Sequence, residues 1–154
     1  LDPRESPRKV LGIDIDIRAH TRSALENHPL RFKMDLIEGS SIEPEIVSEV
    51  RDFARDHDRI LVSLDSNHTH QHVVAELDAY ADLVTPGSYC IVFDTVIENL
   101  PPGYSSHRAW DVGDNPMTAV REWLAAHPEF VIETSLNEKL LVTVAPDGYL
   151  KRIA

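Results

Sequence analysis

The segment Ile60-Leu61-Val62-Ser63-Leu64-Asp65 decides the fold, because it is an apolar run that ends on a carboxylate. The same pattern occurs in Tyr89-Cys90-Ile91-Val92-Phe93-Asp94, and earlier in Lys9-Val10-Leu11-Gly12-Ile13-Asp14. In an open parallel sheet, ligands bind at the carboxyl ends of the strands. Three acids at three predicted strand ends therefore indicate a binding site rather than three unrelated surface charges.

Length and net charge limit which domain organisation and which partners are expected. The 154 residues are enough for a core of useful size, and we expect one domain over residues 1–154. With 15 Lys and Arg against 26 Asp and Glu, the net charge is −11, which repels a phosphate backbone and suits cation binding. Nucleic acid is therefore discounted as a partner. Cys90 is predicted to be a small buried hydrophobe.

No targeting or membrane segment is visible in the sequence. No apolar run approaches the ~20 residues of a membrane span, and no signal peptide stands out, so the cytoplasm is the expected compartment. The sequence leaves the oligomeric state open, a homo-oligomer included.

Apolar spacing and turn residues predict strands that alternate with helices. The predicted strands are residues 9–14, 32–37, 59–64 and 88–93, and the predicted helices are residues 19–27, 44–57, 69–84 and 116–127. Residues 99–116, rich in Pro, Gly, Ser and Asp, are predicted to form a long loop of the kind that often carries function. Residues 130–134 and 140–145, joined at Leu136-Asn137-Glu138, read as a closing antiparallel hairpin.

This order of elements predicts the fold class. Strand–helix alternation indicates an α/β protein with a doubly wound, mostly parallel sheet and helices on both faces. The hairpin adds an antiparallel edge. The combination resembles the methyltransferase variant of the Rossmann-like fold.

Three segments make the resemblance specific. They are V-L-G-I-D-I-D-I-R (residues 10–18), S-L-D-S-N-H-T-H-Q-H-V-V-A-E-L-D-A-Y (63–80), and N-P-M-T-A-V-R-E-W-L (115–124) followed by N-E-K-L-L-V-T-V-A-P-D-G-Y-L-K-R (137–152). Together they resemble the cephalosporin hydroxylase / rhamnosyl O-methyltransferase family over nearly the whole chain from Val10. The resemblance implies a class I methyltransferase fold, S-adenosylmethionine as cofactor, and a divalent metal such as Mg²⁺.

One departure from the family concerns the start of the chain. Such proteins carry a glycine-rich turn after a strand that precedes the one at residues 9–14, and here the chain starts at Leu1-Asp2-Pro3-Arg4. We expect that strand, its turn and the first helix to be missing from this chain. In this fold the strand lies between residues 9–14 and 59–64, so its loss leaves backbone groups unpaired and predicts poor independent stability unless something fills the slot.

Residues for the cofactor follow from the resemblance. Asp14 is expected to accept hydrogen bonds from both ribose hydroxyls, with Asp16 as a weaker candidate, unless the two simply cap the next helix. Gly39, Ser40 and Ser41 form the turn that borders the adenine in related methyltransferases. The alternative for Ser41 is a capping box that opens the helix near Pro44 and Glu45.

Asp65 and Asp94 are the predicted metal ligands. Carboxylates on neighbouring strand ends suit Mg²⁺, which binds one or two of them and keeps several waters. The family has a further acid directly before the second aspartate, where this chain has Phe93, so a weakened metal affinity is expected. The alternative for Asp65 is a cap on the following helix.

The histidines at 68, 70 and 72 are assigned to the acceptor rather than to zinc. On a helix His68 and His72 share a face and His70 does not, and no Glu or Cys completes a zinc set. In the catechol-type methyltransferases, which this site resembles, a base follows the metal aspartate at the spacing of His68, so His68 is the predicted catalytic base beside Asp65. Asn67 and His70 are expected to hydrogen-bond the substrate, unless this segment is a solvated helix start.

In the long loop, His107 and Arg108, with Trp110, fit a substrate lid and fit an ordinary surface loop equally well. Trp123 and Phe130 are expected in the core.

The favoured function is a metal-assisted, S-adenosylmethionine-dependent O-methyltransferase acting on a sugar or small secondary-metabolite hydroxyl. The sequence offers no convincing iron triad of two histidines and a carboxylate, so hydroxylation is not the favoured step. The alternatives are a non-catalytic methyltransferase-like subunit that binds a partner, a fragment that needs its N-terminal portion, and a hydroxylase-associated component of antibiotic biosynthesis.

Overall fold

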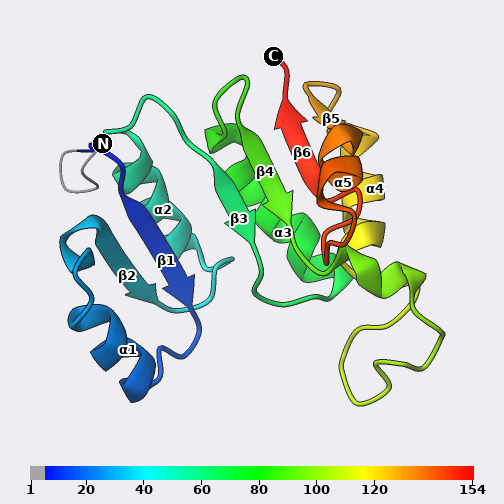
Figure 1. The fold of residues 1–154 in the computed structure, drawn as a ribbon, viewed down its shortest axis with the longest axis horizontal. Helices are drawn as coiled ribbons and strands as arrows, with labels where there is room; N and C mark the ends of the chain where they lie inside the picture. The colour runs from blue at the N-terminus through cyan, green and yellow to red at the C-terminus, as the bar shows by residue number, and fades with distance from the viewer. Residues whose placement is uncertain (1–5) are drawn as a thin grey trace. The chain divides into compact units, whose positions relative to one another are not determined.

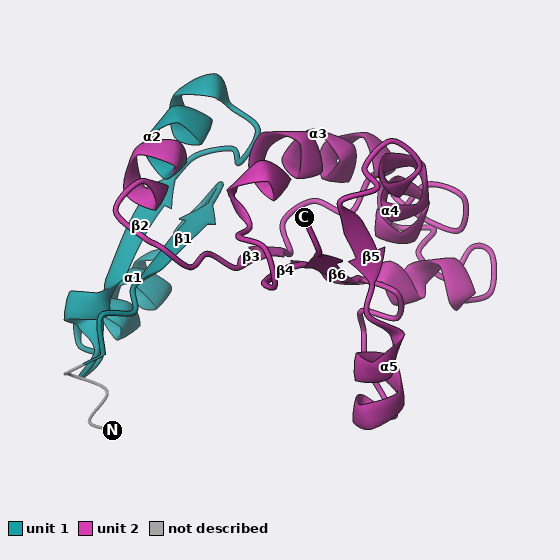
Figure 2. Cartoon of the chain, turned by 90° about the horizontal axis from the view of Figure 1, so that it is seen from above, with its two compact units in different colours: residues 1–50 teal, residues 51–154 magenta. Residues whose placement is uncertain are grey.

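The computed structural model describes residues 6–154, so Leu1-Asp2-Pro3-Arg4, the start from which a missing strand is predicted, lie outside the described residues. The chain divides into two compact units, residues 1–50 and 51–154 (Figure 2). The predicted single domain over residues 1–154 stays a prediction, and each unit is described by itself.

The first unit is built on a two-stranded parallel sheet (Figure 1). Its elements are β1 (Val10–Asp14), α1 (Ala19–Glu26), β2 (Met34–Glu38) and the start of α2 (Pro44–Ala54). The sequence predicted the second strand from Phe32, but Arg31–Lys33 form a 3₁₀ turn and the strand begins at Met34. Asp14 is the register partner of Glu38, and the Gly39 N–H donates to the Asp14 carbonyl at 2.9 Å, so the turn after β2 lies beside the end of β1.

The second unit holds a four-stranded sheet in the order β3-β4-β6-β5. β3 and β4 are parallel, while β6 runs antiparallel to both of its neighbours, β4 and β5. Figure 2 shows α3 and α4 on one side of this sheet and α5 on the other. The elements are β3 (Val62–Leu64), α3 (His70–Tyr80), β4 (Tyr89–Val92), α4 (Pro116–Leu124), β5 (Phe130–Ile132), α5 (Thr134–Leu140) and β6 (Tyr149–Arg152).

The core of the second unit lies between the sheet and its two larger helices. Cys90 and Leu150, register partners on β4 and β6, have no exposed surface. The predictions for three residues are confirmed: Cys90 is a buried thiol, and Trp123 and Phe130 are buried. Burial first, and then the charge of Glu76, raises the pKa of the Cys90 thiol to about 12, so Cys90 is not a reactive thiolate.

The predicted closing hairpin is wrong in detail, although its antiparallel pairing is present. Residues 134–140 form helix α5, so the predicted turn at Leu136-Asn137-Glu138 is helical, and the partner of β5 is β6 rather than residues 140–145. Leu141 and Val142 are 88 % and 89 % exposed. β6, and not residues 140–145, packs into the sheet. Directly before β6, a Cβ at Gly148 would lie 2.1 Å from the Val92 carbonyl oxygen, an approach that only glycine allows.

The long loop is confirmed and is closed at its base. After a 3₁₀ turn at Thr95–Asn99 the chain makes turns until Asn115, which caps α4 by accepting from the Met117 and Thr118 N–H groups. Glu98 ties the two ends of the loop together, since its Oε2 accepts from the Gly113 N–H at 2.8 Å and from Asn115 Nδ2 at 2.5 Å.

The described strands thus form two separate sheets, and no ladder joins β1 to β3 within residues 6–154. That the strand expected between them is missing from this chain stays a prediction. No helix in this described part of the chain is long and apolar enough to cross a membrane.

Candidate metal and acceptor site

Asp65 and Asp94 lie at the same edge of the four-stranded sheet because of the register of β3 and β4. Leu64 and Val92 are register partners in these parallel strands, and the Phe93 N–H donates to the Leu64 carbonyl at 2.9 Å. Asp65 follows Leu64 directly and Asp94 follows Phe93, so both aspartates leave the sheet at this edge.

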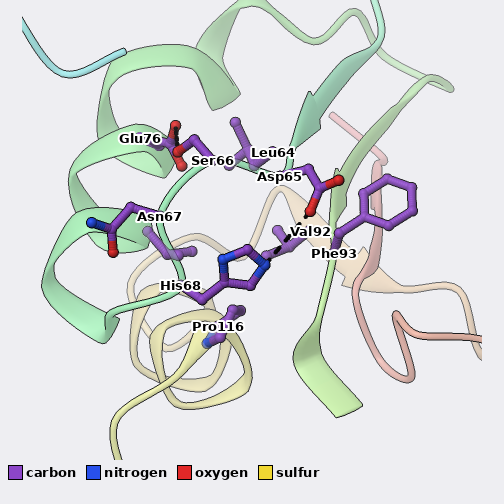
Figure 3. A pocket seen from close by; sticks show the side chains of 10 residues that line it. Leu64, Asp65, Ser66, Asn67, His68, Glu76, Val92, Phe93 and Pro116 are labelled. Atoms are coloured by element: carbon purple, nitrogen blue, oxygen red, sulfur yellow. Dashed lines mark hydrogen bonds and ion pairs between the residues drawn. The ribbon is translucent and has the colours of Figure 1, made fainter. Parts of the chain in front are cut away.

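His68 completes a three-residue cluster with the two aspartates. Its Nε2 lies 2.7 Å from Asp94 Oδ2 and 3.6 Å from Asp65 Oδ1, and one ligand atom from each residue lies within 4.8 Å of the others. Figure 3 shows the His68 ring directed toward Asp65. The His68 side chain is only 13 % exposed. Both ring nitrogens are buried, and among the described residues neither meets a partner in hydrogen-bonding geometry, despite the short contact with Asp94.

The electrostatics of this cluster favour a bound cation. Burial first, and then the charge of Asp94, raises the pKa of Asp65, while His68 lowers it. A divalent ion bound beside Asp65 would offset this cost of its ionisation. One or two carboxylates are the usual protein contribution to a Mg²⁺ site. The residues present therefore fit such an ion, and the weaker metal affinity predicted from Phe93 stays a prediction.

Asp94 is held in a left-handed backbone conformation, with φ 54°. Non-glycine residues adopt this region at a cost, and such strain gathers at functional sites. The turn is secured on its far side, because the buried Thr95 hydroxyl donates to the Pro146 carbonyl at 2.6 Å. The predicted alternative for Asp65 has no support, since the N-cap of α3 is Thr69.

The three neighbouring histidines go to three different places. His68 precedes α3 and joins the two aspartates. His70 joins α3 to α4, since its Nδ1 lies 2.9 Å from Thr118 Oγ1 and its Nε2 3.2 Å from Glu122. His72 lies 3.7 Å from Glu76 on its own helix. They do not form a common metal site.

The long loop reaches the cluster through Trp110. The Trp110 ring stacks on the His68 ring with centroids 4.9 Å apart, and the Arg108 guanidinium lies 5.4 Å from the Trp110 ring centre. Arg108 is thereby brought to the site by way of Trp110. His107 is exposed in the same loop.

Asn67 is engaged locally. Its Oδ1 accepts from both the N–H and the hydroxyl of Thr69, each at 3.0 Å, and so shapes the turn before α3. Figure 3 shows its amide directed away from the His68 ring. The substrate roles predicted for Asn67 and His70 stay predictions.

The predicted cofactor residues gather in the first unit. Asp14 and Asp16 are exposed at the end of β1, where Asp14 Oδ1 accepts from the Asp16 N–H at 3.0 Å. They line a hollow together with Ile15, Ile17, Arg18, His20 and Thr21. Neither caps α1, whose N-cap is Arg18. Gly39-Ser40-Ser41 begin beside Asp14, and α2 starts at Pro44, so Ser41 is not its N-cap.

Sequence reasoning did not single out Ser66 and Glu76, which border the same pocket as Asp65 and His68. Glu76 was detectable: it is an acid at a helical spacing of three from the apolar residue Val73 and of four from Tyr80. Ser66 carried no signal, because a serine in a strand-to-helix loop is common.

The architecture is that of a Rossmann-like methyltransferase. The MycE methyltransferase of the mycinamycin biosynthetic pathway, solved with Mg and SAH, matches 79 % of this chain and 29 % of that protein with 20 % sequence identity and a TM-score of 0.50. A second crystal form of that complex matches with a TM-score of 0.52 and 19 % identity. These likenesses confirm the predicted fold class.

The chain belongs to the rhamnosyl O-methyltransferase/CmcI family, whose model matches residues 1–153. The rhamnosyl O-methyltransferase of Mycobacterium tuberculosis H37Rv is 28 % identical over 150 residues, which cover 95 % of this chain and 56 % of that protein. The Mycobacterium leprae protein is 27 % identical and is covered over 60 % of its length. The chain thus spans between half and two thirds of the length of these relatives, and the predicted family is confirmed.

Proposed function

We propose that this protein takes part in S-adenosylmethionine-dependent, divalent-metal-assisted O-methylation of a sugar or small secondary-metabolite hydroxyl. The observation that carries the proposal is the convergence of Asp65, Asp94 and His68 at one strand edge in a member of the rhamnosyl O-methyltransferase/CmcI family. MycE, which shares the fold, was solved with Mg and SAH, and this supports the same choice of cofactor and metal here.

The second unit would supply the acceptor chemistry. When bound by Asp65 and Asp94, a divalent ion would orient the acceptor hydroxyl and lower its pKa. His68 would take the hydroxyl proton at Nε2, where Asp94 at 2.7 Å and Asp65 at 3.6 Å would stabilise the resulting imidazolium. Trp110 and Arg108 would shield the site from water and contact the acceptor.

The first unit would bind the cofactor. Asp14 would accept hydrogen bonds from the ribose hydroxyls, with Asp16 nearby, and the turn at Gly39-Ser40-Ser41 would border the adenine. The hollow at the end of β1 and the hydrogen bond between Gly39 and Asp14 support this assignment, since they place the acid and the turn together.

Calorimetric titration with S-adenosylmethionine, with and without Mg²⁺, tests the proposal. We expect saturable binding that Asp14→Ala weakens, whereas Asp35→Ala, an exposed aspartate within β2, leaves it unchanged. A folded chain that binds no cofactor would contradict catalysis by this chain and favour a partner-binding role.

A further inference from the structure

Glu76 is the one charged residue among the buried side chains of the described chain, at 2 % exposure. A carboxylate is costly to bury unless it is hydrogen-bonded or paired, and an apolar residue at this place in α3 would pack without that cost. Glu76 therefore calls for an explanation beyond packing.

Its contacts lie toward the metal and acceptor site. Ser66 Oγ donates to Glu76 Oε1 at 2.7 Å, and His72 Nε2 lies 3.7 Å from the same oxygen. Ser66 stands between Asp65 and His68 in the loop that joins β3 to α3. Figure 3 shows Glu76 reaching from the helix to Ser66, with Asp65 and His68 on the same loop.

The charge of Glu76 also raises the pKa values of two neighbouring groups in the core. After burial, it is the next cause that raises the pKa of Tyr80 to about 12 and the pKa of Cys90 to about 12. Glu76 is thus a carboxylate within the packed interior, anchored by α3, which is itself packed on the sheet. An anchor of this kind is well suited to hold a short polar loop.

We propose that Glu76 is a positioning residue which, through its hydrogen bond to Ser66, fixes the strand-end loop (residues 65–69) so that Asp65 and His68 face Asp94. The inference deepens the proposed function and rests on it for the role of the bound ion. Partners that orient metal ligands typically change metal affinity 10–100-fold when they are removed.

A double-mutant cycle read out by Mn²⁺ titration tests this positioning role. Ser66→Ala removes the donor, and Glu76→Met removes the acceptor at similar volume. We expect each to weaken Mn²⁺ binding about tenfold, and the double variant to be no weaker than either, because both lose the same hydrogen bond. Ser66→Thr, which keeps the hydroxyl, is expected to restore affinity.

Asp78→Ala is the matched control. It removes another hydrogen bond of α3, the one that Asp78 Oδ1 accepts from Trp123 Nε1 at 2.9 Å, on a side chain that does not line the site. We expect it to leave Mn²⁺ affinity unchanged. Additive losses in the cycle, or wild-type affinity in Ser66→Ala, would overturn the proposal.

Hydrogen exchange in the metal-free protein separates this inference from the proposed function. We expect Ser66→Ala to speed exchange of the amides of the strand-end loop while the core of α3 stays protected. If the wild-type chain binds no Mn²⁺, the metal part of the proposed function fails, and the exchange result alone decides whether Glu76 holds the loop. Unchanged exchange there overturns the positioning role.

Discussion

Asp94 combines a left-handed backbone with a carboxylate that faces both His68 and Asp65. Asparagine tolerates this backbone region as aspartate does, so Asp94→Asn removes the charge with little strain. We expect the variant to bind Mn²⁺ at least tenfold more weakly, about 1.4 kcal/mol, because a predicted ligand is lost. Its metal-free melting temperature should equal or exceed that of wild type, since the repulsion with Asp65 is relieved.

Calorimetric Mn²⁺ titration and thermal melts measure both effects. Asp147→Asn is the control, because Asp147 also has a positive φ, 59°, and lies outside the cluster. Wild-type Mn²⁺ affinity in Asp94→Asn would remove Asp94 from the list of ligands.

Individual site residues differ in how far the sequence reveals them. Asp65 and Asp94 were predictable because each follows an apolar run, and His68 because it stands three residues after one of them. The contact between Trp110 and His68 was not predictable from the sequence. It depends on the turns in residues 100–115, whose conformation no periodic pattern predicts. The contact between His70 and Glu122 was not predictable either, because only the packing of α3 on α4 brings these two residues near, whereas His72 and Glu76 are an i,i+4 pair on α3.

At the scale of elements, the base of the long loop depends on one carboxylate. The Gly113 N–H first, and then the Asn115 amide, lower the pKa of Glu98, so its charged form stabilises the fold. That contribution is present above the ordinary pKa of a glutamate and is lost as the pH falls through the lower pKa of the folded state. We expect Glu98→Gln to reduce the free energy of unfolding at pH 7 by about 1–2 kcal/mol.

Urea unfolding at pH 7 and at about pH 3.5 checks the direction of this pH dependence. The difference in free energy of unfolding between wild type and Glu98→Gln should be smaller at the lower pH. Glu138→Gln, at an exposed glutamate, is the control. We expect it to have the same free energy of unfolding as wild type at both pH values. A larger difference for Glu98→Gln at the lower pH would show that Glu98 stabilises the loop by some means other than its charge.

Most elements were predictable because parallel strands and amphipathic helices carry clear periods. The positions of β1, β3, β4, α3 and α4 follow those patterns to within a few residues at most of their ends. The predicted closing hairpin did not follow such a pattern, because Leu140-Leu141-Val142 has the composition of a strand but lies exposed. β6 pairs with β4 and β5 instead, and Gly148, directly before it, lies so close to Val92 that only glycine fits, a tertiary feature that local propensity does not contain.

At the scale of the whole molecule, a net charge of −11 makes two effects of a divalent salt easy to confuse. Any salt screens the repulsion among the acids, whereas an ion held by Asp65 and Asp94 stabilises by mass action. At 100 times its dissociation constant a bound ion contributes about 2.7 kcal/mol, which corresponds to a rise of roughly 5–10 °C in melting temperature for a chain of this size. We expect MnCl₂ to raise the melting temperature by this amount more than KCl does at equal ionic strength.

The double variant Asp65→Asn with Asp94→Asn separates the two effects, because it changes the net charge only from −11 to −9 and removes both predicted ligands. It should melt at the same temperature in MnCl₂ and in KCl of equal ionic strength, while wild type shows a saturable difference. If wild type also shows none, the cluster at the strand edge does not hold a divalent ion. The metal part of the proposed function would then fail, and His68 would be left as the group of the cluster that could act on the acceptor.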